Sequence, residues 1–260
     1  MDVRVILVEP KLAENIGAVA RVLKNFGFSE LYLVNPPAFD EKMFWVASHA
    51  DDVLRASTVV SSLDDAIAGT NLVVGTTAKT GISASRHLRK PLFSPRELVA
   101  TLADGGAGGG LLALLFGPED RGLLNDELVH CDLLVSIPTS TAYPVLNLSH
   151  AVAIVLYELY EGQEQQKCEQ GSSLEQQQPA LAAVADKERL FEHLSRFLEE
   201  IEYRAHKRAR TMLMLRRLLG RAVLTAREVR TLRGILRSAE RKLREQERER
   251  ERERERREQR

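Results

Sequence analysis

Three segments of the sequence place glycine and polar side chains where predicted strands end or predicted helices begin. Their polar groups are amides, a carboxylate and a guanidinium, which hydrogen-bond to a substrate or carry charge. The first segment, residues 14–27, has Asn15 where it can cap a helix, Gly17 where another element can approach closely, and Arg21 off the apolar stripe. An isolated arginine on a helix is most often solvated, so this segment alone assigns no chemistry.

The second segment, residues 114–128, contains a turn directly after a buried apolar run. Gly117 and Pro118 force that turn, and Glu119 follows it. The carboxylate of Glu119 can cap the following backbone or pair with an arginine. A turn stabilised by its own acidic residues explains the segment equally well.

The third segment, residues 136–159, runs from a strand end through a loop with two prolines into a helix that Asn147 opens. His150 lies in the first turn of this helix. We interpret His150 as a packed or capping side chain rather than a catalyst.

Several stretches resemble common catalytic motifs but lack the spacing or the neighbouring secondary structure that those motifs require. The glycine-rich match at residues 108–113 precedes a strand instead of opening a helix after one, and residues 75–81 lack the order of a phosphate-binding loop. The six histidines show no metal-ligand spacing, and no GxSxG motif is present. These observations argue against an NTPase, a zinc enzyme and an ordinary serine hydrolase, and we expect no metal.

Apolar runs alternate with helical patterns through residues 1–160, which predicts an α/β fold with a mostly parallel sheet and helices on both faces. The strand candidates are continuously apolar, as strands covered on both faces must be. They are residues 3–8, 31–34, 72–75, 111–116 and 132–137. The helix candidates are residues 15–26, 51–56, 63–68, 95–102, 124–129 and 147–160. Ligands of such sheets bind at the carboxyl ends of strands, so the loops to inspect follow Val8, Val74, Phe116 and Ile137.

The remaining sequence predicts a small all-α carboxyl-terminal domain. Residues 161–185, rich in Gln, Glu and Ser, predict a linker between a domain at 1–160 and a helical domain at 186–245. Helix candidates there are residues 186–201, 206–219 and 226–243. The tail, 246–260, alternates Glu and Arg, which puts like charges at i,i+4. We expect this tail to be frayed and solvated.

The formal net charge of zero conceals a division along the chain. Residues 1–186 carry 13 Lys and Arg against 23 Asp and Glu, a net charge of −10. Residues 187–246 carry 17 against 8, a net charge of +9. An acidic body with a basic domain suggests a polyanionic partner such as nucleic acid, although a solvated amphipathic helical domain has the same composition.

The composition also limits where the protein acts. The longest apolar runs, at 111–116 and 151–157, are far shorter than the roughly 18 residues of a membrane span, so we expect no membrane association. Cys131 and Cys168 lack metal-ligand spacing and are too few for a disulfide framework, which predicts reduced thiols in a cytoplasmic protein. The first residues lead directly into a strand, so no signal peptide is expected.

Taken together, in this order and spacing, the three segments resemble the motifs of the SpoU/TrmH branch of the SPOUT methyltransferases. The resemblance runs from VRVILVEPKLAENIGAVARVLKNFGF through VVGTTA and FGPEDRGL to VLNLSHAV, essentially all of residues 1–160. Residues 215–236, LRRLLGRAVLTAREVRTLRGIL, are similar to the carboxyl-terminal helices of TrmJ-like tRNA ribose methyltransferases.

The resemblance implies that roughly residues 111–160 are threaded into a deep C-terminal trefoil knot, which periodicity does not reveal because true knots are rare. It also implies a homodimer with each active site near the subunit interface. The implied cofactor is S-adenosylmethionine, held in the knot mostly by backbone groups of loops. Carried onto matching positions, the cofactor-binding residues are Thr76, Thr77, Gly117, Glu119, Ile137, Pro138 and Leu146.

The catalytic arginine of the family maps to Arg21, with Asn15 beside it in the first motif and Asn147 in the third. A guanidinium is effectively always protonated and has no acceptor, so it is a poor general base. We therefore favour a role in which Arg21 clamps the adjacent phosphate and the ribose hydroxyl oxygen, while the proton passes to phosphate or water.

One position departs from the family pattern. Many relatives have serine directly before the Leu-Asn of the third motif, where this chain has Val145. The candidates for the role of that serine are Tyr143 and Ser149. The departure leaves open a methyl-inactive, knotted RNA-binding protein, which the other intact motif residues argue against.

The activity that the resemblance implies is 2′-O-methylation of a tRNA ribose at nucleotide 32 of the anticodon loop, with cytidine as the first candidate base and uridine as the second. An alternative within the same branch is 2′-O-methylation of ribosomal RNA, which the TrmJ-like helices argue against. The expected phosphate contacts of the basic domain to tRNA are Arg208, Arg210, Arg216, Arg217, Arg221 and Arg233. We also expect some of these arginines to pair with Glu228 or to pack on the first domain instead.

Overall fold

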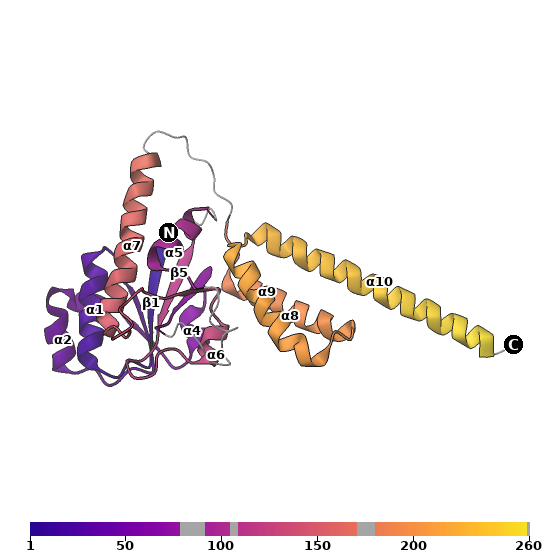
Figure 1. Cartoon of the computed structure of the whole chain (residues 1–260), viewed down its shortest axis with the longest axis horizontal. Coiled ribbons are helices and arrows are strands. Elements are labelled where there is room, and N and C mark those ends of the chain that lie inside the picture. Colours follow the sequence, from indigo (N-terminus) through magenta and orange to yellow (C-terminus); the bar gives the residue numbers. More distant parts are fainter. Residues whose placement is uncertain (79–91, 105–108, 171–179, 259–260) are drawn as a thin grey trace.

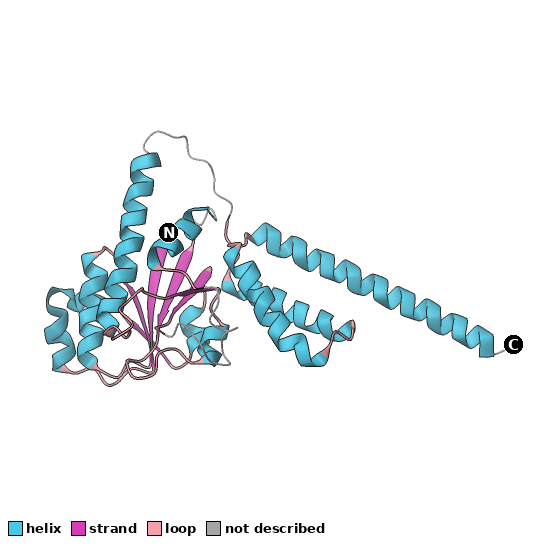
Figure 2. Cartoon of the chain, in the orientation of Figure 1, coloured by secondary structure: helices cyan, strands magenta, loops and turns pink. Residues whose placement is uncertain are grey.

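A computed structural model describes residues 1–78, 92–104, 109–170 and 180–258 of the chain. Figure 1 shows a sheet domain, which contains the amino terminus, and a helical arm that extends to one side of it. We call residues 180–258 the arm. The strands that Figure 2 draws all lie in the sheet domain, and the arm is built from helices.

The sheet has six parallel strands in the order β3-β2-β1-β5-β4-β6. They are β1 Asp2–Val8, β2 Glu30–Val34, β3 Thr58–Val60, β4 Leu72–Thr76, β5 Leu111–Phe116 and β6 Leu133–Val135. Five of them lie within two residues of their predicted ends. The parallel α/β sheet predicted from the sequence is therefore confirmed.

Helices cover both faces of this sheet, as predicted. One face packs against α1 Ala13–Asn25, α2 Glu41–Ala47, α3 Asp51–Arg55, α5 Pro95–Asp104 and α7 Leu148–Gln170, with a short 3-10 turn at Ser48–Ala50. The other face packs against α4 Leu63–Ile67 and α6 Asn125–Val129. Side chains of β1 alternate between the two: Val5 and Leu7 join the first core, and Ile6 joins the second.

Strand β3, helix α2 and the short 3-10 turn at Ser48–Ala50 were not predicted. Strand β3 is three residues long and mostly exposed, so it carries little apolar signal. Helix α2 is also short; Asp40 caps it by accepting a hydrogen bond from the Met43 amide at 2.9 Å. Its buried positions, Met43 and Ala47, hold it against α1.

Helix α1 carries the first sequence motif. Ile16, Val19 and Leu23 form its buried stripe, and Gly27 takes the left-handed conformation predicted for the helix end, with φ of 73°. A Cβ atom at Gly17 would lie 2.2 Å from the Met43 carbonyl oxygen, which confirms the close approach expected there. The helix begins at Ala13, so the prediction that Asn15 caps it is wrong.

Helix α7 extends ten residues beyond the predicted domain end at Tyr160, so the linker predicted from residue 161 is helical as far as Gln170. Gln and Glu are good helix formers. Packing also extends the helix, because a Cβ atom at Gly162 would lie 2.3 Å from the Val99 side chain, and Gln163 donates to the Met1 carbonyl at 2.9 Å. The trefoil knot stays a prediction, since residues 79–91 lie outside the described residues.

The arm contains three helices, α8 Val184–Glu200, α9 Ala205–Arg221 and α10 Ala226–Glu258, around a small core of Ala182, Leu190, Leu224 and Val229. The prediction of a frayed tail is wrong as far as Glu258, because α10 continues to that residue and projects away from the body (Figure 1). Glu and Arg both favour helix, and the alternation places opposite charges at i,i+3.

Candidate active site

The structure joins the three sequence motifs through one chain of hydrogen bonds. Asn15 of α1 donates its amide to a Glu119 carboxylate oxygen at 2.6 Å. Asn147, just before α7, donates to the Asn15 amide oxygen at 3.0 Å. The Asn147 amide oxygen in turn accepts from the backbone amide of Ser149 at 2.9 Å and from its hydroxyl at 2.8 Å. Residues far apart in the sequence therefore form one polar cluster at the carboxyl edge of the sheet.

Glu119 also binds the backbone that leads into α1. Its two carboxylate oxygens accept from the amides of Lys11 at 2.8 Å and Leu12 at 3.3 Å. A carboxylate at the amino end of a helix satisfies unpaired N–H groups and interacts favourably with the helix dipole. The sequence left two roles open for Glu119, a local cap or an arginine pair, and the observed role is the cap of a distant helix.

The same contacts set the charge of Glu119. Its partial burial alone would raise the pKa of the carboxyl, but the hydrogen bonds from Asn15, Lys11 and Leu12 outweigh burial and hold the pKa below its ordinary value. Glu119 is therefore a fixed negative charge and an acceptor near neutral pH, not an acid ready to donate a proton.

The turn that carries Glu119 is folded back tightly on itself. A Cβ atom at Gly117 would lie 2.3 Å from the backbone of Gly122 and Leu123, so only glycine fits there. Gly122 has φ of 66° and donates its amide to the Pro118 carbonyl at 2.9 Å. Residues 117–123, which we call the cavity loop, thus have a fixed backbone beside the polar cluster.

A cavity of about 490 Å³ lies next to this loop, at the carboxyl ends of β4, β5 and β6. Its size is in the range of small-molecule sites, and its walls combine apolar side chains with loop backbone. Six of the seven residues predicted to bind the cofactor line it, whereas Pro138 is exposed and does not. The six are Thr76, Thr77, Gly117, Glu119, Ile137 and Leu146.

Sequence reasoning missed Arg121, which also lines the cavity. Its guanidinium donates to Glu9 at 2.8 Å and pairs with Glu127 at 3.4 Å, so it joins the loop after β1 to the cavity loop and α6. Partial burial alone would lower the pKa of Arg121, but its bonds to Glu9 and Glu127 outweigh burial and raise it. The sequence signal that could have identified Arg121 is that it is a basic residue within the second motif.

The predicted catalytic residues divide into two groups. Asn15, Asn147 and Ser149 belong to the polar cluster, and the Ser149 hydroxyl is used in its bond to Asn147. Arg21 and Tyr143 are exposed and do not line the cavity, and within the described part of the chain the Arg21 side chain forms no hydrogen bond or ion pair. Arg21 lies six residues beyond Asn15, which is about 9 Å along the α1 axis.

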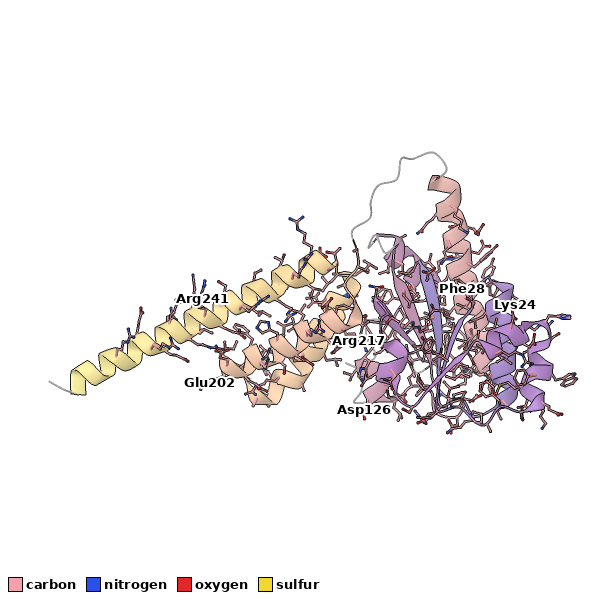
Figure 3. All side chains as sticks on the ribbon, turned by 180° about the vertical axis from the view of Figure 1, so that it is seen from behind. Lys24, Phe28, Asp126, Glu202, Arg217 and Arg241 are labelled. Atoms are coloured by element: carbon pink, nitrogen blue, oxygen red, sulfur yellow. The ribbon has the colours of Figure 1, made fainter. Side chains whose placement is uncertain are left out.

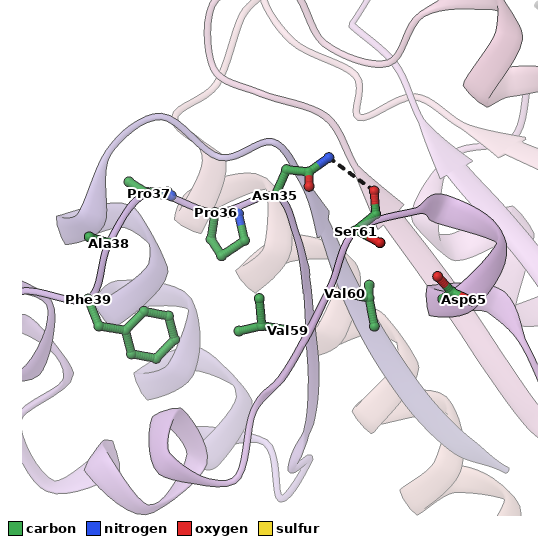
Figure 4. A pocket seen from close by; sticks show the side chains of 9 residues that line it. All are labelled: Asn35, Pro36, Pro37, Ala38, Phe39, Val59, Val60, Ser61 and Asp65. Carbon is green, nitrogen blue, oxygen red and sulfur yellow. Dashed lines mark hydrogen bonds between the residues drawn. The ribbon is translucent and has the colours of Figure 1, made fainter.

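A second, wide depression of about 740 Å³ lies at the ends of β2 and β3 (Figure 4). Pro36, Pro37, Phe39 and Val59 supply much of its surface, and Asn35 donates across it to the Ser61 carbonyl at 3.2 Å. The residues of the three motifs do not line this depression. Its lining is mainly apolar, and Asn35, Ser61 and Asp65 are its polar members.

Two of the six arginines predicted to contact RNA form contacts within the protein, and one of them, Arg217, packs on the sheet domain as expected for some of this set. Arg217 is buried and donates to the carbonyls of Cys131 at 2.6 Å and Leu128 at 2.9 Å. Arg216 pairs with both Glu188 oxygens and stacks over Phe191, with 4.2 Å to the ring centroid. Their burial depends on tertiary packing, which cannot be inferred from the pattern of charges along the sequence.

The other four predicted arginines differ in exposure. Arg208 donates to the Tyr203 carbonyl at 3.0 Å and lies 3.6 Å from Glu199, and Arg233 is half-buried. Arg210 and Arg221 are exposed and make no side-chain hydrogen bond or ion pair within the residues that the structure describes. These last two remain available to a partner.

Two further findings concern metals and membranes. No group of His, Cys, Asp and Glu among the described residues could hold a metal ion. No described helix combines the length and apolar character needed to cross a membrane.

Both the sheet domain and the arm are similar to known protein families. The SpoU rRNA Methylase family model matches residues 2–157, and the model of the tRNA methyltransferase TrmJ C-terminal domain matches residues 185–248. The tRNA (cytidine-2'-O-)-methyltransferase TrmJ of Methanocaldococcus jannaschii is 36% identical over 232 residues, which cover 88% of this chain and 96% of that protein. The tRNA (cytidine/uridine-2'-O-)-methyltransferase TrmJ of Pectobacterium atrosepticum is 39% identical over 242 residues, with 92% and 97% covered.

A solved structure agrees with these relatives. The crystal structure of TrmJ from Z. mobilis ZM4 superposes with a TM-score of 0.70 at 29% identity, covering 92% of this chain and all of that one. The matches extend through the sheet domain, with its polar cluster and cavity, and through the arm. The chain therefore belongs to the SpoU methylase family, in the group of methyltransferases that carry a TrmJ C-terminal domain.

Proposed function

We propose that this protein is an S-adenosylmethionine-dependent methyltransferase that methylates a tRNA ribose 2′-hydroxyl at nucleotide 32 of the anticodon loop, with cytidine as the first candidate base and uridine as the second. The single observation that carries the proposal is the polar cluster of Glu119, Asn15 and Asn147 beside the cavity. The relatives named as tRNA 2′-O-methyltransferases over both parts of the chain support the choice of substrate.

The cavity fits S-adenosylmethionine in size and in chemistry. Its apolar walls, among them Phe116, Leu123 and Val135, suit an adenine ring and a thioether chain, while the cavity loop and Thr77 present backbone groups. Bound there, the cofactor supplies an electrophilic methyl group. The negative charge of Glu119, held by its three donors, suits a cationic sulfonium nearby.

Arg21 is the proposed group that holds the RNA at the reacting oxygen. Its guanidinium clamps the adjacent phosphate and stabilises the negative charge that develops on the ribose oxygen, and phosphate or water takes the proton. Arg21 is exposed and outside the cavity of its own chain, so in this proposal it serves the cavity of a second copy.

A homodimer is part of the proposal for the same reason. Large apolar side chains are exposed around α1, the third motif and α7, and apolar side chains gathered on a surface suit contact with another protein surface. They are Leu12, Tyr143, Val145, Ile154, Tyr157 and Tyr160. A second copy covering these side chains would bring Arg21 to a subunit interface.

The arm supplies the proposed tRNA interface on one side of α9. Five of its exposed residues fall on a single helical face, since they are spaced by three, four, four and three positions. They are Lys207, Arg210, Met214, Leu218 and Arg221. The three cations suit phosphate oxygens, whose contacts position RNA without reading its sequence.

The test is to incubate the purified protein with labelled S-adenosylmethionine and, in separate reactions, bulk unmodified tRNA or unmodified ribosomal RNA, and then map the labelled nucleoside. The proposal expects label on the 2′-oxygen of nucleotide 32. Label on a base atom, label only on ribosomal RNA, or no transfer to either RNA would each contradict it. A tRNA carrying a 2′-deoxy nucleotide at position 32 is the matched control and should accept no methyl group.

A further inference from the structure

The arm is joined to the sheet domain by buried polar contacts, which we call the seam. Figure 3 shows Arg217 where the arm meets the sheet domain, and Glu202 and Arg241 far from it along the arm. The seam consists of Thr70, Asn71, Leu128, Cys131 and Asp132 of the sheet domain, and Leu181, Ala182, Val184, Lys187, Arg217 and Gly220 of the arm.

A buried ion pair lies at the centre of the seam. Lys187 of α8 donates to Asp132 at 2.5 Å, and the two side chains are 5% and 4% exposed. The same Asp132 oxygen accepts from the Val73 amide at 3.0 Å, which connects the pair to β4. A buried ion pair contributes little net stability, because desolvation offsets the attraction, but losing one partner is costly. Removing Lys187 would leave the Asp132 carboxylate buried without its cationic partner.

Arg217 fixes α9 at the end of α6. Its guanidinium donates to the carbonyls of Leu128 and Cys131, which lie at and just beyond the last turn of that helix. A cation at this position satisfies free carbonyls and interacts favourably with the helix dipole. One turn later, a Cβ atom at Gly220 would lie 2.8 Å from the Asp132 carbonyl oxygen, so α9 packs directly on the backbone before β6.

The backbone that enters the arm is held as well. Val184 donates its amide to the Thr70 carbonyl at 2.8 Å. The Asn71 amide donates to the carbonyls of Leu181 and Ala182 at 3.3 Å, while its oxygen accepts from the Leu111 amide at 2.9 Å. Helices α8 and α9 are thus fixed to the sheet domain at several separate points.

The seam is connected to the cavity by a short element. Helix α6 begins two residues after the cavity loop ends at Leu123, and its last turn accepts the Arg217 bond. The exposed face of α9, from Lys207 to Arg221, lies on the helix that carries Arg217. Anchoring Arg217 therefore sets the position of that face relative to the cavity of the same chain.

We propose that Lys187 and Arg217 are positioning residues: they hold the arm as a rigid support, so that RNA bound on α9 is presented at a fixed distance from the cavity. This inference rests on the proposed function. RNA held by a loosened arm would meet the active site at a lower effective concentration, without any change in the cavity.

The test compares full-length wild type with Lys187→Met, and uses Lys167→Met as the control. Lys167 is an exposed lysine paired with Glu164 at 2.7 Å, away from the seam. For Lys187→Met, we expect the KM for tRNA to rise by about tenfold or more, with kcat at saturating tRNA within about threefold of wild type. The dissociation constant of S-adenosylmethionine, measured by calorimetry without RNA, should stay within about twofold.

Small-angle X-ray scattering of the RNA-free proteins provides the second readout. Wild type and the Lys167→Met control should fit a single arrangement with the arm in a fixed position, and Lys187→Met should show a broader distribution of interatomic distances. Lys187→Arg, which keeps the charge, should recover part of the tRNA KM. If Lys187→Met does not fold, Asp132→Asn removes the partner charge and takes its place.

Three outcomes would overturn the inference. They are an unchanged tRNA KM, a weakening of cofactor binding in parallel with the tRNA KM, and an unchanged scattering profile despite a raised KM. The scattering comparison needs no RNA, so it tests the rigid arm even if wild type methylates no tRNA. Failure of the proposed function and failure of the seam are thereby distinguished.

Discussion

Asn15 donates to Glu119 at 2.6 Å across a separation of 104 residues, and this bond joins the start of α1 to the cavity loop. Glu119 is at once the cap of a helix, the acceptor for Asn15 and part of the cavity wall. The stability of the first motif and the shape of the proposed cofactor site therefore depend on one carboxylate.

Replacing Glu119 by Ala should lower stability and cofactor affinity together. The amides of Lys11 and Leu12 and the Asn15 side chain would lose their acceptor, at a cost of about 1–2 kcal/mol in the free energy of unfolding. Urea unfolding and calorimetric titration with S-adenosylmethionine measure the two effects. Glu192→Ala is the control and should change neither, because it removes an exposed carboxylate in the middle of α8 that forms no side-chain hydrogen bond or ion pair within the described residues.

The lowered pKa of Glu119 also predicts a dependence of stability on pH. Because the folded state favours the charged form, the contribution of Glu119 is fully present above its ordinary pKa and is lost as the pH falls through the folded-state pKa. The difference in unfolding free energy between wild type and Glu119→Gln should be constant above about pH 6 and shrink below about pH 4. A difference that grows on acidification would show that the folded state raises this pKa.

Arg21→Ala should abolish turnover while leaving the cofactor site intact. Arg21 does not line the cavity, so its removal should leave the dissociation constant of S-adenosylmethionine nearly unchanged, whereas loss of a charge-stabilising donor should lower kcat by about a hundredfold or more. Single-turnover methylation of tRNA measures this, with Arg55→Ala, an exposed arginine of α3, as the control. An Arg21→Ala enzyme that keeps most of its activity rules out the proposed role.

Mixed dimers test in a second way whether Arg21 acts on the cavity of the other subunit. Combining Arg21→Ala subunits with subunits that carry Glu119→Ala should restore up to one working site per dimer if Arg21 acts on the cavity of the other subunit. Homodimers of either variant should remain inactive or nearly so. Activity that is never restored in the mixture would place Arg21 and the cavity of a working site in the same chain.

Arg121→Met should weaken cofactor binding by roughly tenfold, since the cavity loop would lose its connection to Glu9. The expected change is a raised dissociation constant for S-adenosylmethionine with little change in the KM for tRNA. Arg96→Met removes an exposed arginine whose nearest carboxylate, Glu158, is 3.6 Å away, and should leave both constants as in wild type. A tRNA effect without a cofactor effect would argue that Arg121 contacts RNA instead.

Cys131 should be unreactive in the folded protein, because burial raises the pKa of its thiol to about 12. In a Cys168→Ser background, which leaves Cys131 as the remaining thiol, a disulfide reagent at pH 8 should label the unfolded chain and not the native one. Rapid labelling under native conditions would mean that the region between α6 and β6, where Arg217 binds, opens readily.

The sequence predicted the sheet because its strands are continuously apolar runs, a local property that burial on both faces demands. It missed β3 because a three-residue edge strand with exposed side chains has no such run. Asn15, Glu119 and Asn147 were identified as site residues only through the family resemblance. Their hydrogen bonds to one another depend on how the chain returns in space, which no local pattern contains.

The arm shows the same limit for charge. Arg216, Arg217 and Arg221 are close together in a basic stretch, and only the structure separates a stacked ion pair, a buried helix contact and an exposed cation. The tail shows the opposite case: unfavourable like-charge pairs suggested fraying, yet the high helix propensity of Glu and Arg prevails to Glu258.

The division of charge between the acidic sheet domain and the basic arm makes the molecule an electric dipole with no net charge. An approaching polyanion therefore feels no overall attraction at long range, but it is turned so that it meets the arm first and is repelled from the opposite end. Such orientation acts only within about 10 Å at 0.1 M ionic strength, so encounters should become randomly oriented as salt is added.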